Sequence, residues 1–153
     1  MRLQLALNVD DLDAAIDFYT KMFDTPPAKI RPGYANFAIA NPPLKLVLFE
    51  GGGANGSINH LGVETETAAE VAAAEARLTD AGLATTGIDE TLCCYAEKTE
   101  TWVDAPDTNK WEWYVKTGDS DQLHNVVVSG ADTGGSGCCA APVQDATSTT
   151  CCA

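Results

Sequence analysis

The spacing of apolar residues changes along the chain from a strand-like period of two to a helical period. Residues 4–9 alternate as a strand, and apolar residues then recur at helical spacing over residues 12–23, where two prolines follow. Two further apolar segments, residues 34–40 and 44–50, flank a turn. The first part of the chain therefore predicts a strand, a helix and then further strands.

The same order of elements begins again after a glycine-rich connector at residues 51–57. A strand is predicted over residues 60–65, followed by a helix that begins at a capping box of Thr67 and Glu70 and stops at Gly82. The remaining strands of this half are predicted at residues 84–88, 95–103 and 111–116. Strand, helix and strand meander thus occur twice, which predicts an α+β protein.

The strand and helix patterns fade beyond the last of these segments. We expect one domain over residues 1–118, with modules at about residues 1–50 and 58–118. Residues 119–153 are expected to form a flexible, cysteine-containing tail. From about Asp132 this tail is mostly Gly, Ser, Thr, Ala and Cys, which are too small or too polar to build a core.

Each module begins its first strand with a residue that can bind a metal ion, Gln4 in the first and His60 in the second. A third such residue, Glu112, lies in the last apolar segment. Because neighbours on a strand point to opposite faces, the mostly apolar neighbours of these three residues should face away from them. Each residue alone fits a satisfied core or strand-edge side chain. Together with the repeat, the three predict one shared metal site.

Composition narrows the classes of partner. The 153 residues contain 9 Lys and Arg against 22 Asp and Glu, and the formal net charge of −13 argues against binding to nucleic acid. No apolar run approaches the ~20 residues of a membrane span, and the first residues do not read as a secretory signal. We therefore expect a cytoplasmic protein that binds neither nucleic acid nor membrane. Such acidity also fits a salty cytosol.

The six cysteines occur as three adjacent pairs, namely Cys93 and Cys94, Cys138 and Cys139, and Cys151 and Cys152. Adjacent Cα atoms lie about 3.8 Å apart, less than the ~4.4–6.8 Å of a usual disulfide, which favours reduced thiols. Paired thiols in a reducing compartment indicate a soft metal or metalloid ligand. The spacing does not specifically indicate a four-cysteine zinc site.

Two stretches of the chain carry a family resemblance. Residues 32–48 contain Pro-Gly-Tyr-Ala-Asn-Phe-Ala-Ile-Ala and then Pro-Pro-Leu-Lys-Leu-Val-Leu, and Cys-Cys-Tyr-Ala at 93–96 is followed by Trp-Val at 102–103 and Trp-Glu at 111–112. These stretches resemble the arsenic-carbon lyase and cadmium-inducible protein family of the vicinal oxygen chelate (glyoxalase, bleomycin resistance, extradiol dioxygenase) superfamily. The resemblance covers roughly residues 1–117 and implies paired βαβββ modules that curl around a metal.

The resemblance implies a non-haem Fe(II)-dependent dioxygenase. With dioxygen as co-substrate, it would cleave the carbon-arsenic bond of trivalent organoarsenicals such as methylarsenite and give arsenite and an aldehyde. The family's metal positions fall on Gln4, where the family often has histidine, and on His60 and Glu112. Its arsenical-binding pair falls on Cys93 and Cys94. The tail pairs are candidates for capturing arsenite, arsenicals or cadmium, and a second copy of the chain, in a homodimer, is a candidate partner.

The first module has no carboxylate at the place corresponding to Glu112, which lies near Lys45. Glyoxalases of the superfamily use four protein ligands, whereas three ligands leave open positions where dioxygen binds in facial-triad iron enzymes. The donor set therefore favours an oxygenase.

Two other functions stay open from the sequence. A non-catalytic resistance protein that binds cadmium or arsenite through thiols needs the cysteines but not the three metal donors. A drug-sequestering protein of the same fold needs neither set and would leave the donors without a role. The joint presence of both sets favours the lyase.

Overall fold

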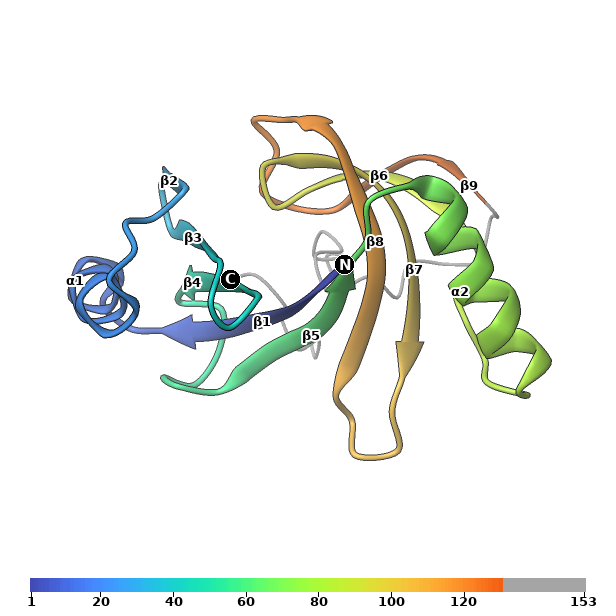
Figure 1. Ribbon diagram of the computed structural model, residues 1–153, viewed down its shortest axis with the longest axis horizontal. Coiled ribbons are helices and arrows are strands. Elements are labelled where there is room, and N and C mark those ends of the chain that lie inside the picture. Colours follow the sequence, from blue (N-terminus) through green and yellow to red (C-terminus); the bar gives the residue numbers. More distant parts are fainter. Residues whose placement is uncertain (131–153) are drawn as a thin grey trace, which may run out of the picture.

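The described part of the chain, residues 1–130 of the computed structural model, consists of two modules with the same order of elements (Figure 1). The first module contains β1 (Arg2–Val9), α1 (Leu12–Phe23), β2 (Lys29–Arg31), β3 (Tyr34–Ile39) and β4 (Leu44–Glu50). The second contains β5 (Ile58–Glu64), α2 (Ala68–Asp80), β6 (Asp89–Cys93), β7 (Ala96–Asp104), β8 (Lys110–Asp119) and β9 (Val126–Gly130). No helix in this range is long and apolar enough to cross a membrane.

The strands of both modules form one continuous sheet in the order β2-β3-β4-β1-β5-β8-β7-β6-β9. Inside each module the first strand pairs in parallel with the last strand of its meander, β1 with β4 and β5 with β8. The modules join where β1 and β5 pair antiparallel. In Figure 1 the sheet curls, with α1 at one end of the molecule and α2 at the other. This mixed, curled sheet with two helices is the vicinal oxygen chelate arrangement.

Both helices begin at the side-chain caps that the sequence indicates. The Asp11 carboxylate accepts a hydrogen bond from the Ala14 amide at 2.9 Å, and α1 ends at Asp24, whose φ of 46° is left-handed. A reciprocal capping box of Thr67 and Glu70 starts α2. The apolar side of α1 packs on a buried cluster from β1, β3 and β4, so the helix covers the first module.

The strand predicted at residues 84–88 is wrong. In this segment only Thr85 forms an isolated bridge, to Val103, and the strand β6 begins at Asp89. Gly87 explains the delay, because its φ of +79° interrupts an extended backbone. β7 also begins one residue later than predicted, because Tyr95 lies in the turn before it.

Regular structure continues past residue 118, where the sequence pattern placed the end of the domain. β8 extends to Asp119, and β9 pairs antiparallel with β6. The tail was predicted over residues 119–153, and its part from residue 131 onward lies outside the described residues. That part contains Cys138, Cys139, Cys151 and Cys152.

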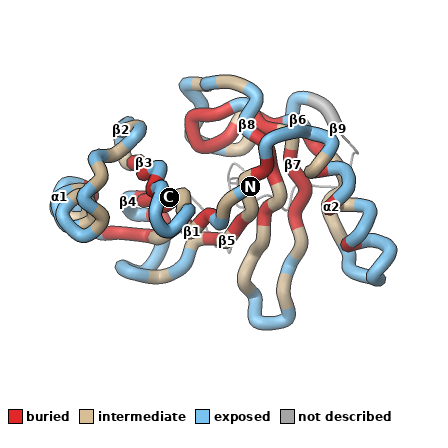
Figure 2. The backbone as a smooth tube through the Cα atoms, in the orientation of Figure 1, coloured by how far each residue is buried: buried red, intermediate tan, exposed pale blue. Residues whose placement is uncertain are grey.

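Several polar residues are buried, and buried segments run along the strands of the curled sheet (Figure 2). Gln4 is only 4 % exposed, whereas its neighbour Leu3 is 55 % exposed. His60 and Glu112 are equally buried, at 2 % and 0 %. The alternation of faces therefore places all three predicted donors inside the curl, where an unpaired polar group would be costly.

Candidate metal and thiol site

Gln4 from β1, His60 from β5 and Glu112 from β8 meet at the junction of the two modules. The Gln4 amide nitrogen, Nε2, lies 2.9 Å from His60 Nε2 and 3.1 Å from Glu112 Oε2. His60 Nε2 and Glu112 Oε2 lie 3.6 Å apart. Neighbouring ligand atoms that bind one ion at ~2.1 Å lie about 3 Å apart, so the three side chains would suit a single metal ion with the Gln4 amide turned to place its oxygen where Nε2 lies.

A glycine makes room for this set. A Cβ at Gly62 would lie 3.1 Å from the Glu112 carbonyl oxygen and 3.5 Å from Gln4 Nε2. Gly62 pairs with Gln4 on one side and with Glu112 on the other, so a side chain there would press on both donors. No group of three His, Cys, Asp or Glu side chains within residues 1–130 could hold a metal, and the amide of Gln4 is the third member here.

His60 is oriented by an amide neighbour. His60 Nδ1 lies 2.8 Å from Asn59 Oδ1, and Asn59 Nδ2 in turn donates to Asn8 Oδ1 at 2.9 Å. An amide oxygen accepts a hydrogen bond, so Nδ1 carries the proton and Nε2 keeps its lone pair toward Gln4 and Glu112. This tautomer is the one that binds a metal through Nε2.

Gln4 is held on its other side by a phenol. Tyr114 donates from its hydroxyl to Gln4 Oε1 at 2.5 Å, and Lys45 Nζ donates to the same hydroxyl at 2.8 Å. Burial, reinforced by the nearby Glu112 charge, raises the pKa of Tyr114 well above its usual value, so the phenol stays protonated. An amide binds metals through oxygen, so a ligating Gln4 would present Oε1 inward and leave Nε2 to donate to the phenol.

Lys98 fixes the second oxygen of Glu112. Its Nζ lies 2.6 Å from Glu112 Oε1 and 3.6 Å from Glu100 Oε2. Burial alone would lower the pKa of Lys98, but the charges of Glu112 and Glu100 outweigh it and raise that pKa well above its usual value. Burial raises the pKa of Glu100 to about 8 against the opposing charge of Lys98. Glu112 is thus anchored by one oxygen and offers the other to the site.

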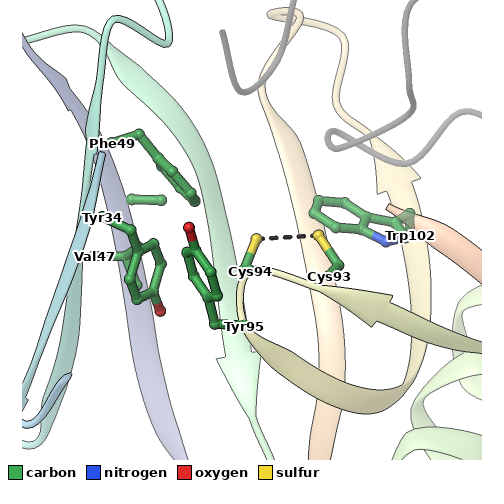
Figure 3. Close-up of a cluster of buried hydrophobic side chains, with 8 residues drawn as sticks. Tyr34, Val47, Phe49, Cys93, Cys94, Tyr95 and Trp102 are labelled. Atoms are coloured by element: carbon green, nitrogen blue, oxygen red, sulfur yellow. Dashed lines mark hydrogen bonds between the residues drawn. The ribbon is translucent and has the colours of Figure 1, made fainter. Parts of the chain in front are cut away.

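Cys93 and Cys94 place their sulfurs side by side, with Sγ atoms 3.1 Å apart (Figure 3). Adjacent residues within a strand would point to opposite faces, but Cys94 and Tyr95 form a two-residue turn between β6 and β7, with φ of 56° and 60°. Positive φ at both central residues is the requirement of a type I′ turn, which Asn-Gly usually fills. The turn therefore brings together two thiols that strand geometry would separate.

Hydrogen bonds from both modules hold the turn at Cys94 and Tyr95. The amide groups of Cys94 and Tyr95 donate to the carbonyl oxygens of Leu123 and Gln122, at 2.9 and 2.8 Å. The Tyr95 hydroxyl donates to the Pro32 carbonyl at 3.1 Å, which ties the turn to the first module. The second module thus presents its thiols across the junction.

One cavity joins the thiols to the metal donors. It has a volume of about 190 Å³, and its lining includes Gln4, His60 and Cys94. Trp102 lies beside both sets, because its ring is 5.3 Å from the His60 ring and packs in the same cluster as both cysteines. Three of the five predicted site residues of the described chain therefore line this cavity, and the other two, Glu112 and Cys93, lie directly beside Gln4 and Cys94.

The place corresponding to Glu112 in the first module carries no carboxylate. Lys45 pairs directly with Gln4 across β1 and β4, and the residue two positions further on the same face is Val47. Neither side chain adds a fourth anionic ligand.

The sequence did not indicate three side chains that support the site. The Tyr114 contact with Gln4 and the Lys98 contact with Glu112 depend on strand register, which places residues 14 or more positions apart next to each other. Asn59 directly precedes His60, but alternation alone would have turned its side chain to the other face. The only sequence signal was alternation, because Tyr114 follows Glu112 by two positions and so shares its face.

Comparison with known proteins assigns the chain to a class. Residues 3–113 match the model of the Glyoxalase/Bleomycin resistance protein/Dioxygenase superfamily, and the chain belongs to this superfamily. Among solved structures, the fold is similar to the Mn(II)-bound glyoxalase from Novosphingobium aromaticivorans, with a TM-score of 0.56 and 17 % identity over 78 % of this chain and 41 % of that one.

Within the superfamily, two curated relatives are much more similar. A trivalent organoarsenical cleaving enzyme from Thermomonospora curvata is 56 % identical over 123 residues, covering 80 % of this chain and 82 % of the relative. The cadmium-induced protein CadI from Mycobacterium tuberculosis is 55 % identical over 120 residues, covering 78 % and 79 %. The chain therefore belongs to the family that these two proteins represent.

Proposed function

We propose that this protein is an Fe(II)-dependent dioxygenase that cleaves the carbon-arsenic bond of trivalent organoarsenicals. The observation that supports this proposal most directly is that one cavity is lined by Gln4, His60 and Cys94. A 56 % identical relative named as a trivalent organoarsenical cleaving enzyme supports the same reaction.

The thiols supply the binding step. Methylarsenite carries two hydroxyl groups on arsenic, and two thiols can replace them with release of two waters. The sulfurs of Cys93 and Cys94 already lie 3.1 Å apart, so one arsenic atom can bind both with little movement of the chain. Thiolates prefer soft partners, and this preference selects arsenic over harder ions. The turn then holds the organic group in the cavity beside the metal donors.

The buried donors supply the metal site. Gln4, His60 and Glu112 would hold Fe(II), which when bound supplies the activation of dioxygen. Lys98 keeps Glu112 Oε1 occupied and so limits the carboxylate to one ligating oxygen. Asn59 keeps the proton of His60 on Nδ1. Trp102, Phe49 and Tyr34 pack with both cysteines in one buried cluster, which gives this space an apolar side.

The overall reaction balances without an external reductant. Methylarsenite in its dihydroxy form plus one dioxygen molecule contains the atoms of formaldehyde plus arsenous acid. Two electrons leave the methyl carbon and two leave the carbon-arsenic bond, and dioxygen accepts all four. Arsenous acid then leaves the thiols by exchange with water.

The proposal is tested by measuring arsenite formation at controlled iron and oxygen concentrations. Purified protein is loaded with Fe(II) anaerobically, methylarsenite and a thiol reductant are added, air is admitted, and arsenite is quantified by chromatography with mass detection. Many arsenite molecules per iron, and none without iron or oxygen, are expected. Stoichiometric retention of intact methylarsenite would contradict the proposal and favour a thiol-based protein that binds arsenicals or cadmium without turnover.

A further inference from the structure

The cavity between the modules concentrates positive charge in an acidic protein. The chain has a net charge of −13 and nine Lys and Arg residues, and five of the nine line this one cavity. These five are Arg2, Lys29, Lys45, Lys98 and Lys116. Glu64 is the one carboxylate in the cavity lining. A positive cavity in a negative molecule focuses the field on an anion that enters it.

Lys98 already contacts two carboxylates, Glu112 and Glu100, but the other four cations have fewer carboxylates than charges. Arg2 and Lys45 share Glu64, to which Arg2 is hydrogen-bonded and Lys45 Nζ lies at 3.5 Å. Burial would raise the pKa of Glu64, but the nearby Lys45 charge and the Arg2 contact hold it below its usual value, so it counts as one negative charge. Two cations therefore face one anion on this side.

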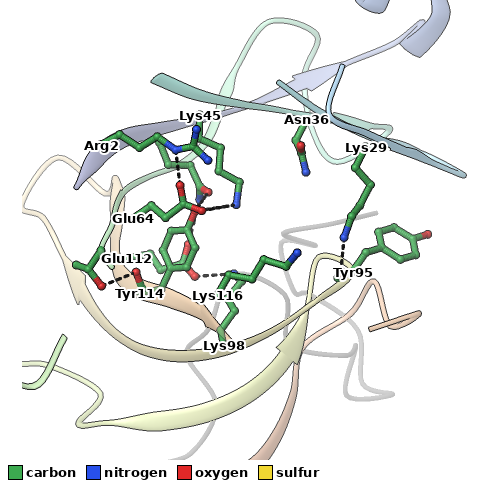
Figure 4. A network of polar contacts seen from close by, with 12 residues as sticks. Arg2, Lys29, Asn36, Lys45, Glu64, Tyr95, Lys98, Glu112, Tyr114 and Lys116 are labelled. Atoms are coloured by element: carbon green, nitrogen blue, oxygen red, sulfur yellow. Dashed lines mark hydrogen bonds and ion pairs between the residues drawn. The ribbon is translucent and has the colours of Figure 1, made fainter. Parts of the chain in front are cut away.

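The opposite side of the cavity repeats this imbalance. Lys29 and Lys116 share Asp119, with Lys116 Nζ 2.9 Å from its carboxylate. Lys29 also donates to the Tyr95 carbonyl at 2.9 Å, directly beside the thiol turn. Four cations around the cavity thus share two carboxylates, and the lysine side chains reach into the space between the modules (Figure 4).

Methylarsenite uses none of this charge, because its organic group is only a methyl. We propose that the preferred substrates carry an oxyanion, such as a carboxylate, on the organic group attached to arsenic. Arsenic binds at Cys93 and Cys94, and the oxyanion lies between Lys29 and Lys116. This substrate class rests on the proposed function for its chemistry, while the charge of the cavity stands without it.

The geometry gives each end of such a substrate a partner. Cys94, Lys29 and Lys116 line the same cavity, and Lys29 contacts the residue that follows Cys94. Lys116 is the more informative residue to change. Its side chain is 37 % exposed and its ion pair is with Asp119, a partner already held by Lys29, so removing it breaks no buried network.

The test compares two arsenicals that differ in charge but hardly in shape, trivalent 4-carboxyphenylarsenite and 4-carbamoylphenylarsenite. Binding is measured by tryptophan fluorescence on iron-free, reduced, full-length protein in which the four tail cysteines are serine, so that Cys93 and Cys94 are reported. We expect the carboxylate to bind roughly tenfold more tightly at low salt, since hydrogen bonds to charged groups contribute at this level. The preference should fall toward one near 1 M salt.

Three variants test whether Lys116 is responsible for the preference for the carboxylate arsenical. Lys116→Gln should lower the carboxylate preference several-fold, and Lys116→Arg should retain it. Lys21→Gln, which removes the same charge from the exposed face of α1, is the matched control and should leave the preference unchanged. Equal affinity for the two arsenicals, or an equal loss of preference in Lys21→Gln, would overturn the proposal.

Turnover of the same two compounds separates this inference from the proposed function. If neither is cleaved but the carboxylate still binds more tightly, the lyase proposal fails and the oxyanion site stands. If both are cleaved with equal affinity and equal KM, the lyase stands and the oxyanion site fails.

Discussion

Glu112 divides its two oxygens between two tasks. One oxygen is held by Lys98 at 2.6 Å, and the other faces Gln4 at 3.1 Å and His60 at 3.6 Å. The proposed arsenic ligands lie elsewhere, Cys93 at the end of β6 and Cys94 in the turn that follows. Under the proposed function, metal binding and arsenical binding would therefore depend on different residues and could be removed one at a time.

Glu112→Gln should lower kcat by at least ~100-fold and weaken iron binding, because it removes the anionic ligand while keeping the shape of the side chain. Its arsenical affinity, measured by fluorescence without iron, should stay within a few-fold of the parent. Cys94→Ser should show the reverse, with iron retained and arsenical affinity lost. Equal loss of arsenical binding in both variants would contradict the separate roles.

Asp119 should show an unusually low pKa. Hydrogen bonds from Lys29 and then Lys116 lower it to about 2, below the usual value near 3.9. Because the folded-state pKa is depressed, the interaction stabilises the protein above pH ~4 and is lost as pH falls toward 2. Lys29→Met should raise the pKa of Asp119, as measured by carboxyl-carbon NMR. An unchanged value would refute the link, and Lys21→Met is the control.

The burial of the three candidate donors was predictable, but the contacts that orient them were not. Gln4, His60 and Glu112 could be found because alternation puts them on one face of their strands. Lys98 and Tyr114 acquire their roles from contacts with Glu112 and with Gln4, 110 positions away. Such contacts depend on register between strands, which no local pattern in this sequence specifies.

At the scale of elements, the capping box of α2 provides a direct test of local stability. Thr67→Ala should lower the free energy of unfolding by about 1 kcal/mol, because the Thr67 hydroxyl no longer accepts the Glu70 amide hydrogen bond. Urea denaturation measures the change, and Thr67→Ser should restore most of it. A Thr67→Ala variant as stable as the parent would show that the cap contributes little here.

Strong local signals defined the helices and the longer strands. The caps and apolar stripes predicted α1 and α2, and alternation predicted β1, β3, β4, β5 and β8. The strand predicted at 84–88 failed at Gly87, and the short strands β2 and β9 were missed because each gains its hydrogen bonds from a distant partner or a brief hairpin. The turn at Cys94 was missed because neither of its central residues is Gly, Asn or Asp.

At the scale of the whole molecule, net charge should govern the response to salt. With a charge of −13 and nine Lys and Arg residues, repulsion among carboxylates opposes folding at low ionic strength. Tm should therefore rise by several degrees between 0.05 and 1 M NaCl, as salt screens this repulsion. Differential scanning calorimetry measures it, with an uncharged osmolyte at equal osmolality as control. A Tm that falls over this range would refute the expectation.

The antiparallel pairing of β1 with β5 joins the two modules, and it also has a consequence for a protein made of two chains. Gln4 lies in one module and Glu112 in the other, and the connector at residues 51–57 links them covalently. Two chains that exchanged modules would rebuild the same pairing, with each site drawn from both polypeptides. Mixing an inactive Gln4→Ala chain with an inactive Glu112→Ala chain would then regenerate one intact centre. If chains exchange modules, complementation between the two variants would follow from the placement of Gln4 and Glu112 in different modules.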